Sequence, residues 1–122
     1  VRLRVRDPYA ARNARFALQA AGKEIGKDIL VFMELGVVIS RSVAAAEERA
    51  LLIEDMNDCD LFPGIASVLG TVYNVADAIE SYVGLGAADG VILVPASLPT
   101  DLASVLKGVL PLIDARAKLE QQ

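Results

Sequence analysis

The sequence predicts an α/β domain built from parallel β-α units. Two short apolar runs rich in β-branched residues, 28–40 and 90–95, have the composition of strands buried on both faces, as in a parallel sheet. Helical patterns lie before and after each run, so strands and helices alternate along the chain. The 122 residues suit one domain, and no linker or low-complexity tract divides them.

The N-terminal third is expected to hold an arm, a helix and a strand. Apolar and basic residues alternate over 1–6, which is typical of an edge strand or an extended arm. A proline in the first turn favours a helix over 9–21, and Gly22 is expected to end it. The strand at 28–40 contains Gly36, which we expect to bend or break it.

The remaining elements follow from capping residues and apolar spacing. Ser42 is a suitable N-cap for a helix over 43–56. A short strand is expected at 66–70, and Asn74 is expected to cap the helix after it. A last helical region follows the second apolar run, and Pro111 is expected to kink or restart that region.

Composition excludes several kinds of chemistry. The chain has no histidine, so Ser-His-Asp catalysis, Cys-His catalysis and histidine metal sites are absent from it. Cys59 is the one cysteine, so an intrachain disulfide and a thiolate metal site are excluded too. We expect no metal, and a reducing cytoplasm fits this cysteine usage.

The charge distribution does not favour nucleic-acid binding or a membrane location. Net charge is −4, with seven Lys/Arg and two Asp/Glu in residues 1–27 against five and fourteen in the remainder. The basic end is short and aromatic residues are few, so we expect no nucleic-acid partner. The longest apolar run, 29–39, contains Glu34 and is too short to span a bilayer, and no signal peptide is visible.

High apolar content predicts a partner surface. The chain is 54% hydrophobic with a mean hydropathy of +0.44, although a domain of this size leaves much of its surface exposed to water. We therefore expect part of the apolar surface to contact the missing part of a larger domain or another subunit, and a homo-oligomer is expected.

Three local patterns invite a functional interpretation, and each has a simpler one. Residues 84–90 contain a G-x-G, but they follow a helix and precede a strand, which is the reverse of a pyrophosphate loop, so a helix C-cap is favoured. Residues 55–60 are acidic but lack the spacing of a calcium loop. Glu34 inside an apolar strand marks either a site or, as we favour, a carboxylate that is exposed or paired with an arginine.

An ordered series of motifs in the second half of the chain resembles a known family. The series comprises Gly70-Thr71, Val75-Ala76-Asp77, Ile79, Tyr82, Gly86 to Pro95, Leu98-Pro99, Leu102, Val109 to Leu112 and Arg116. It resembles the C-terminal end of luciferase-like flavin-dependent monooxygenases, in the branch with nitrilotriacetate, dibenzothiophene-sulfone and pristinamycin-type monooxygenases. The strand-helix pair at 28–48 is also similar. The chain departs from the family pattern at three places. It has Val72-Tyr73 where the family usually has Pro and an acidic residue, it has Val91 where Phe is common, and its 57–68 segment is short for this branch.

The resemblance implies the C-terminal part of a (β/α)8 TIM barrel. Such a barrel takes roughly 250 residues, so residues 1–122 are expected to form a single segment of an incomplete barrel that is inactive alone. The family's catalytic groups mostly lie upstream, so no catalytic residue is carried over. Pro95, Ala96 and Ser97, at the end of the last strand, are the candidates to line the active-site mouth, because barrel sites lie at the C-terminal ends of strands.

Three hypotheses about function remain open. In the first, the parent enzyme uses reduced FMN, delivered by a partner flavin reductase, and O2 to oxygenate a small organic substrate. In the second, a deazaflavin replaces FMN and the enzyme transfers hydride. In the third, the chain is a non-catalytic interaction or structural fragment.

Overall fold

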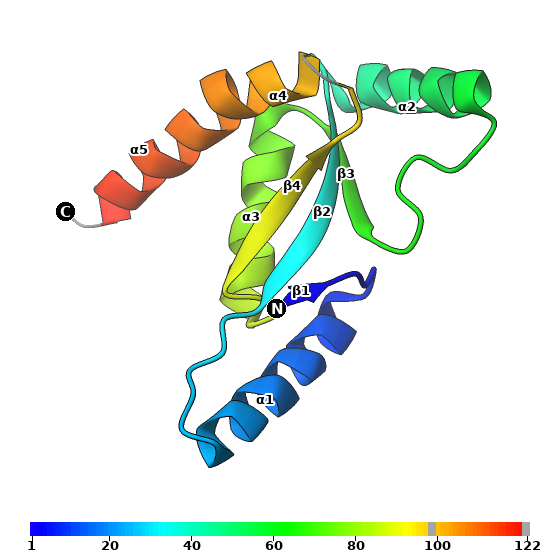
Figure 1. Ribbon diagram of the computed structural model, residues 1–122. Helices are drawn as coiled ribbons and strands as arrows, with labels where there is room; N and C mark the ends of the chain where they lie inside the picture. Colours follow the sequence, from blue (N-terminus) through cyan, green and yellow to red (C-terminus); the bar gives the residue numbers. More distant parts are fainter. Residues whose placement is uncertain (98–99, 121–122) are drawn as a thin grey trace.

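The protein is a four-stranded parallel sheet with helices packed mainly on one face (Figure 1). The computed structural model describes residues 1–97 and 100–120. Leu98 and Pro99, which belong to the motif series above, lie outside the described residues. In chain order the elements are β1 (Arg2–Leu3), α1 (Pro8–Glu24), β2 (Phe32–Ile39), α2 (Val43–Asn57), β3 (Ala66–Gly70), α3 (Val72–Leu85), β4 (Gly90–Pro95), α4 (Thr100–Ser104), a π-helical turn (Val105–Val109) and α5 (Leu110–Glu120).

Strand β2 is the centre of the sheet. It pairs with β4 along one edge, from Phe32↔Gly90 to Val37↔Pro95. On its other edge it pairs first with β1 and then, from Leu35 onward, with β3. All pairings are parallel, which confirms the predicted α/β class with parallel β-α units.

Strand β3 interrupts the strand order of a regular barrel. Consecutive strands of a (β/α)8 barrel are neighbours, and β1, β2 and β4 follow that rule. The short strand β3 instead pairs with the same edge of β2 as β1 does, further along the strand. Strands β3 and β4 therefore lie on opposite sides of β2. The chain therefore crosses β2 between these two strands by way of α3.

The two faces of β2 differ because side chains alternate along a strand. The odd-numbered residues Met33, Leu35 and Val37 are fully buried in the main core, which α3 and the π-helical turn close with Val75 and Val109. The even-numbered residues form what we call the inner face, which the helices cover less completely. Here Val38 packs with apolar residues of α2 and of the loop after it.

Gly36 does not break β2, so the break that we expected as one alternative to a bend is wrong. The strand runs without interruption from Phe32 to Ile39 and pairs on both edges at this position. The ring of Phe62 lies over Gly36, and a Cβ built there would meet ring atoms at 2.4 Å. The glycine is present because an aromatic ring occupies the space that a side chain would need.

Two helix boundaries also differ from expectation. Helix α1 continues past Gly22 to Glu24, because this buried glycine lies against Ile29 inside the last turn and the chain reverses only afterwards. Helix α3 begins earlier than expected: Thr71 is the N-cap, and Asn74 is the third residue of a reciprocal capping box. The expected cap at Ser42 is confirmed.

The C-terminal helix contains the irregularity expected near Pro111. A π-helical turn at Val105–Val109 joins α4 to α5, and the N–H of Leu110 donates to the carbonyl of Val105. Proline lacks the N–H that an α-helical turn would use, so the wider turn accommodates it. Gly108 in this turn lies against Val72, where a Cβ would be 2.6 Å from the valine side chain.

Large apolar residues remain exposed on several helices, including Leu51, Leu52 and Met56 of α2. Within residues 1–97 and 100–120, no helix combines the length and apolar character that crossing a bilayer requires. The prediction that a partner covers part of this apolar surface stays a prediction.

Candidate functional site

The ends of three parallel strands meet at one edge of the sheet, which we call the carboxyl edge. Ligand sites of parallel α/β folds lie at this edge, because the loops after the strands converge there. Pro95 ends β4, and the half-buried Ala96 and Ser97 follow it. The N–H of Ala96 donates to the carbonyl of Val37 at 3.0 Å, which fixes this segment to β2. The three predicted site residues therefore lie where barrel geometry placed them, and their role in binding stays a prediction.

A buried carboxylate, paired with a partly exposed arginine, holds the carboxyl edge together. Asp101 is fully buried, and its two oxygens accept hydrogen bonds from both terminal nitrogens of Arg49 at 3.0 and 2.9 Å. The same oxygens accept the N–H groups of Ile39 and Ser97, each at 2.9 Å. Arg49 also donates to the carbonyl of Ile39 at 2.8 Å.

The Arg49–Asp101 pair joins α2, β2, the segment after β4 and α4. A buried carboxylate is tolerated when an opposite charge and hydrogen bonds compensate its desolvation. Each oxygen of Asp101 accepts one hydrogen bond from Arg49 and one from a backbone N–H. This makes the pair a positioning element that fixes Ser97, rather than a reactive group. Sequence reasoning missed it, because an Asp near the start of a helix also suits an ordinary exposed cap.

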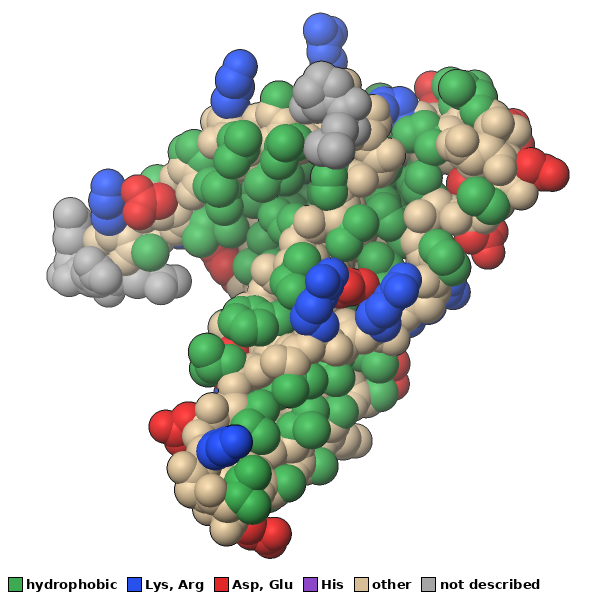
Figure 2. All heavy atoms as spheres, viewed as in Figure 1, with side chains coloured by type: hydrophobic (Ala, Val, Ile, Leu, Met, Phe, Trp, Pro, Cys, Tyr) green, Lys and Arg blue, Asp and Glu red, His purple; other side chains and the backbone are tan. Residues whose placement is uncertain are grey.

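Glu34 forms a second charged group, on the inner face. The residue is 7% exposed, and it pairs with Arg2 and, at 3.1 Å, with Arg4. The favoured interpretation of Glu34 as a carboxylate paired with arginine is confirmed. Figure 2 shows hydrophobic side chains over much of the face that carries β4 and β2, with an acidic side chain between two basic ones near β1.

The turn at 84–90 is structural, as its place after a helix indicated. Gly86 has φ +84° and ends α3 in the left-handed conformation. Asp89 then accepts hydrogen bonds from Arg15 at 2.7 Å and from the N–H of Val31 at 2.7 Å. The bond from Arg15 and that from the Val31 amide hold the pKa of Asp89 below its ordinary value of 3.8.

The acidic loop after α2 does not form a metal centre. In the part of the chain that the structure describes, no cluster of three or more Asp, Glu, Cys or His side chains has the arrangement to hold an ion. Cys59 is exposed in this loop.

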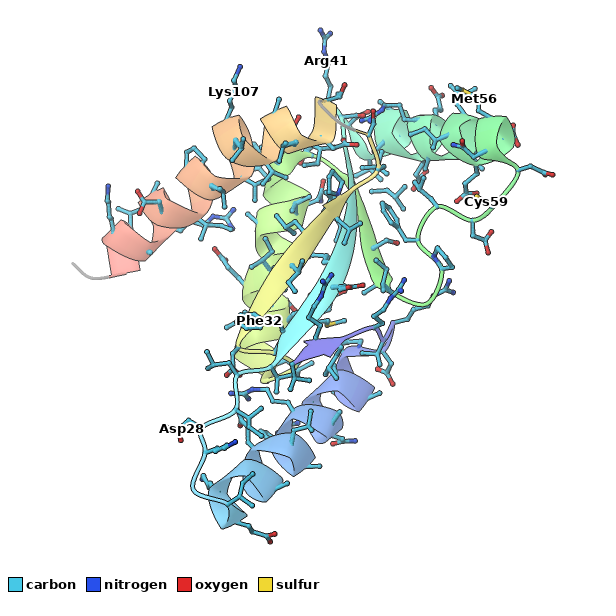
Figure 3. All side chains as sticks on the ribbon, in the orientation of Figure 1. Asp28, Phe32, Arg41, Met56, Cys59 and Lys107 are labelled. Atoms are coloured by element: carbon cyan, nitrogen blue, oxygen red, sulfur yellow. The ribbon has the colours of Figure 1, made fainter. Side chains whose placement is uncertain are left out.

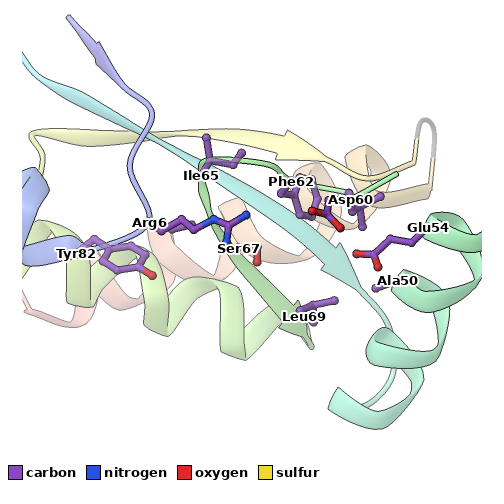
Figure 4. A pocket seen from close by; sticks show the side chains of 11 residues that line it. Arg6, Ala50, Glu54, Asp60, Phe62, Ile65, Ser67, Leu69 and Tyr82 are labelled. Carbon is purple, nitrogen blue, oxygen red and sulfur yellow. The ribbon is translucent and has the colours of Figure 1, made fainter. Parts of the chain in front are cut away.

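An open cleft of about 490 Å³ lies beside the edge of β3 that faces away from β2 (Figure 4). Arg6 and Ser67 lie together in one part of it, and Glu54 and Asp60 lie in another. Leu69 contributes an apolar wall between α2 and β3. Sequence reasoning did not find this cleft, because its walls come from four separate segments of the chain.

Comparison with known proteins identifies the fold. No family model matches the chain, and no curated protein matches its sequence. Among solved structures it is similar to long-chain alkane monooxygenase (LadA), with a TM-score of 0.77 and 16% identity over 96% of this chain and 36% of that one. It is also similar to EDTA monooxygenase (EmoA) from Chelativorans sp. BNC1, with a TM-score of 0.72 and 19% identity over 94% and 39%.

These likenesses establish the architecture: parallel β-α units that correspond to part of a larger TIM barrel. The expected fold class is therefore confirmed. The chain spans well under half the length of either neighbour.

Proposed function

We propose that this chain is one segment of a flavin-dependent monooxygenase barrel, whose intact protein uses reduced FMN and O2 to oxygenate a small organic substrate. The observation that carries the proposal is the fold likeness to long-chain alkane monooxygenase over 96% of the chain. The motif series from Gly70 to Arg116 supports it independently, since it rests on sequence.

In this proposal the segment supplies part of the barrel wall. Phe32, Ile92 and Val94 lie on the inner face and are half-buried, so they offer an apolar surface toward the barrel interior. Apolar walls exclude water from a reacting flavin and orient an organic substrate. The remaining strands and most contacts with the cofactor would come from additional polypeptide. That polypeptide would also cover the exposed apolar surface of this segment.

Among the described residues, those at the carboxyl edge do not form a flavin phosphate site alone. A phosphate needs several cations or backbone amides directed at one point. Arg49 is held by Asp101, and Figure 3 shows Arg41 and Lys107 pointing outward at the carboxyl edge. The contribution of Ala96 and Ser97 would be to line the mouth of the site, with the phosphate held elsewhere.

The test uses the intact protein that contains this segment. Purified protein is mixed with reduced FMN and O2, and substrate-dependent product is measured against O2 uptake. Replacing Ser97→Leu is expected to lower kcat/KM about tenfold by filling the mouth, whereas Ser81→Leu on exposed α3 leaves it unchanged. Product formed with a reduced deazaflavin and without O2 would establish the hydride-transfer alternative. Absence of binding to either flavin would leave the non-catalytic role.

A further inference from the structure

The cleft beside β3 combines opposite charges that have no partners in the described structure. Arg6 enters from the segment after β1, Glu54 from α2 and Asp60 from the following loop. None of the three forms an ion pair or a side-chain hydrogen bond with another described residue, whereas Arg2, Arg4, Arg15, Arg49 and Arg116 all do. The charges of the cleft are therefore available to a ligand.

The charges are separated within the cleft. Figure 4 shows the guanidinium of Arg6 beside Ser67, with Tyr82 on its other side. The carboxylates of Glu54 and Asp60 lie toward the opposite end. The hydroxyl groups of Ser67 and Tyr82 make no hydrogen bond with the described residues, so the basic end offers further polar contacts.

We propose that this cleft binds a small dipolar molecule that carries a carboxylate at one end and an ammonium group at the other. The carboxylate pairs with Arg6, since a guanidinium presents several donors to a carboxylate. The ammonium group lies between Glu54 and Asp60. The connecting carbon chain packs on Phe62 and Leu69, which line the same cleft.

Volume and charge both select this class of ligand. About 490 Å³ lies within the range of roughly 300–1,000 Å³ that small-molecule sites occupy. Two carboxylates against one guanidinium leave the cleft net negative, so a simple anion is repelled at one end. A simple amine leaves Arg6 without a partner. A molecule with both charges satisfies both ends, and this holds whether or not the parent protein oxygenates anything.

The test compares three ligands of similar length. Binding of 6-aminohexanoate, hexanoate and hexylammonium is measured by NMR titration and calorimetry, and shorter ω-amino acids then report the separation of the charges. We expect 6-aminohexanoate to bind at least about tenfold more tightly than either singly charged compound. Arg6→Gln should weaken it to the level of hexylammonium, and Glu54→Gln to the level of hexanoate.

Matched controls use the same substitutions on exposed residues. Arg41→Gln and Glu48→Gln, the latter on the same helix as Glu54, should change affinity less than twofold. Equal binding of the three ligands would overturn the proposal, as would equal effects of Glu48→Gln and Glu54→Gln. The proposal would also be overturned if none of the three ligands bound and another polypeptide segment were found paired to the free edge of β3. None of these outcomes bears on FMN-dependent O2 uptake, so the two proposals fail separately.

Discussion

Asp101 and Asp89 fix opposite ends of the sheet by the same means. Each carboxylate joins an arginine to backbone N–H groups beside β2: Asp101 with Arg49 at the carboxyl edge, and Asp89 with Arg15 at the amino edge. The two differ in exposure, since Asp101 is fully buried and the side chain of Asp89 is 19% exposed. We expect Asp101 to contribute to stability through its ion pair, and Asp89 to give stability a dependence on pH.

Replacing Asp101→Asn should destabilise the protein by about 3–5 kcal/mol. The amide keeps the shape of the side chain, but its NH2 group then faces other donors, namely Arg49 or the N–H of Ser97. The substitution also leaves the guanidinium of Arg49 without its countercharge. The free energy of unfolding from urea denaturation measures the effect. Asp114→Asn, which removes the exposed pair with Lys118, should change it by less than about 0.5 kcal/mol. A loss under 1 kcal/mol for Asp101→Asn would mean that the ion pair contributes little.

Acid should remove the stabilisation that Asp89 provides. Its pKa is lowered in the folded protein, chiefly by Arg15 and then by the amide of Val31. The folded state therefore holds this proton less tightly than the unfolded chain. The contribution is fully present above the unfolded value near 3.8 and is lost as pH falls through the lower folded value. The difference in unfolding free energy between wild type and Asp89→Asn should be constant from pH 5 to 7 and shrink below about pH 4. A difference independent of pH would contradict the assignment.

At the scale of elements, the contact between Gly36 and Phe62 joins β2 to the loop after α2. The ring covers the inner face of the strand, and the glycine is the residue that allows this approach. The same loop provides Asp60 and Phe62 to the cleft. The packing of one ring on one glycine thus sets the position of a wall of the candidate ligand site.

Gly36→Ala should cost about 1–3 kcal/mol, because the new methyl group displaces the Phe62 ring. Gly84→Ala is the matched control: this glycine lies within α3 with nothing within 4 Å, so alanine should stabilise the helix by about 0.5–1 kcal/mol. Thermal and urea unfolding of both variants measure the two effects. If Phe62→Leu relieves part of the Gly36→Ala penalty in a double-mutant cycle, the ring is the cause. Additive effects would exclude it.

The elements themselves were largely predictable, and their contacts were not. Alternation of apolar runs with capped helices predicted β2, β3, β4 and the cap at Ser42, because these depend on local sequence. Gly36 was misinterpreted because the ring that covers it is 26 positions away in sequence. Asn74 was misassigned because both members of a capping box are good N-caps, and only coordinates distinguish them. Pairing of Arg49 with Asp101, and the cleft, depend on tertiary neighbours.

At the scale of the molecule, β1, β2 and β4 form a series of adjacent parallel strands with free outer edges. Parallel sheets are usually buried on both faces, yet in this chain the helices cover mainly one face, and the inner face keeps half-exposed apolar residues. This arrangement is what a part of a larger barrel would have, and it agrees with the share of the neighbours that the chain spans.

Backbone hydrogen exchange can test whether further strands join at β4. The N–H of Ala96 donates to the carbonyl of Val37, and Val37 pairs with Pro95 in the ladder. Alternation therefore directs the amides of Ile92 and Val94 toward β2 and those of Val91 and Leu93 toward the free edge. In this chain alone, the free-edge amides should exchange at least about tenfold faster than the paired ones, since they lack ladder hydrogen bonds. In the intact protein proposed above, a neighbouring strand should protect Val91 and Leu93 to the level of Ile92. Unchanged fast exchange there would mean that β4 is a true edge, and that the apolar inner face must be covered by something other than the next strand of a barrel.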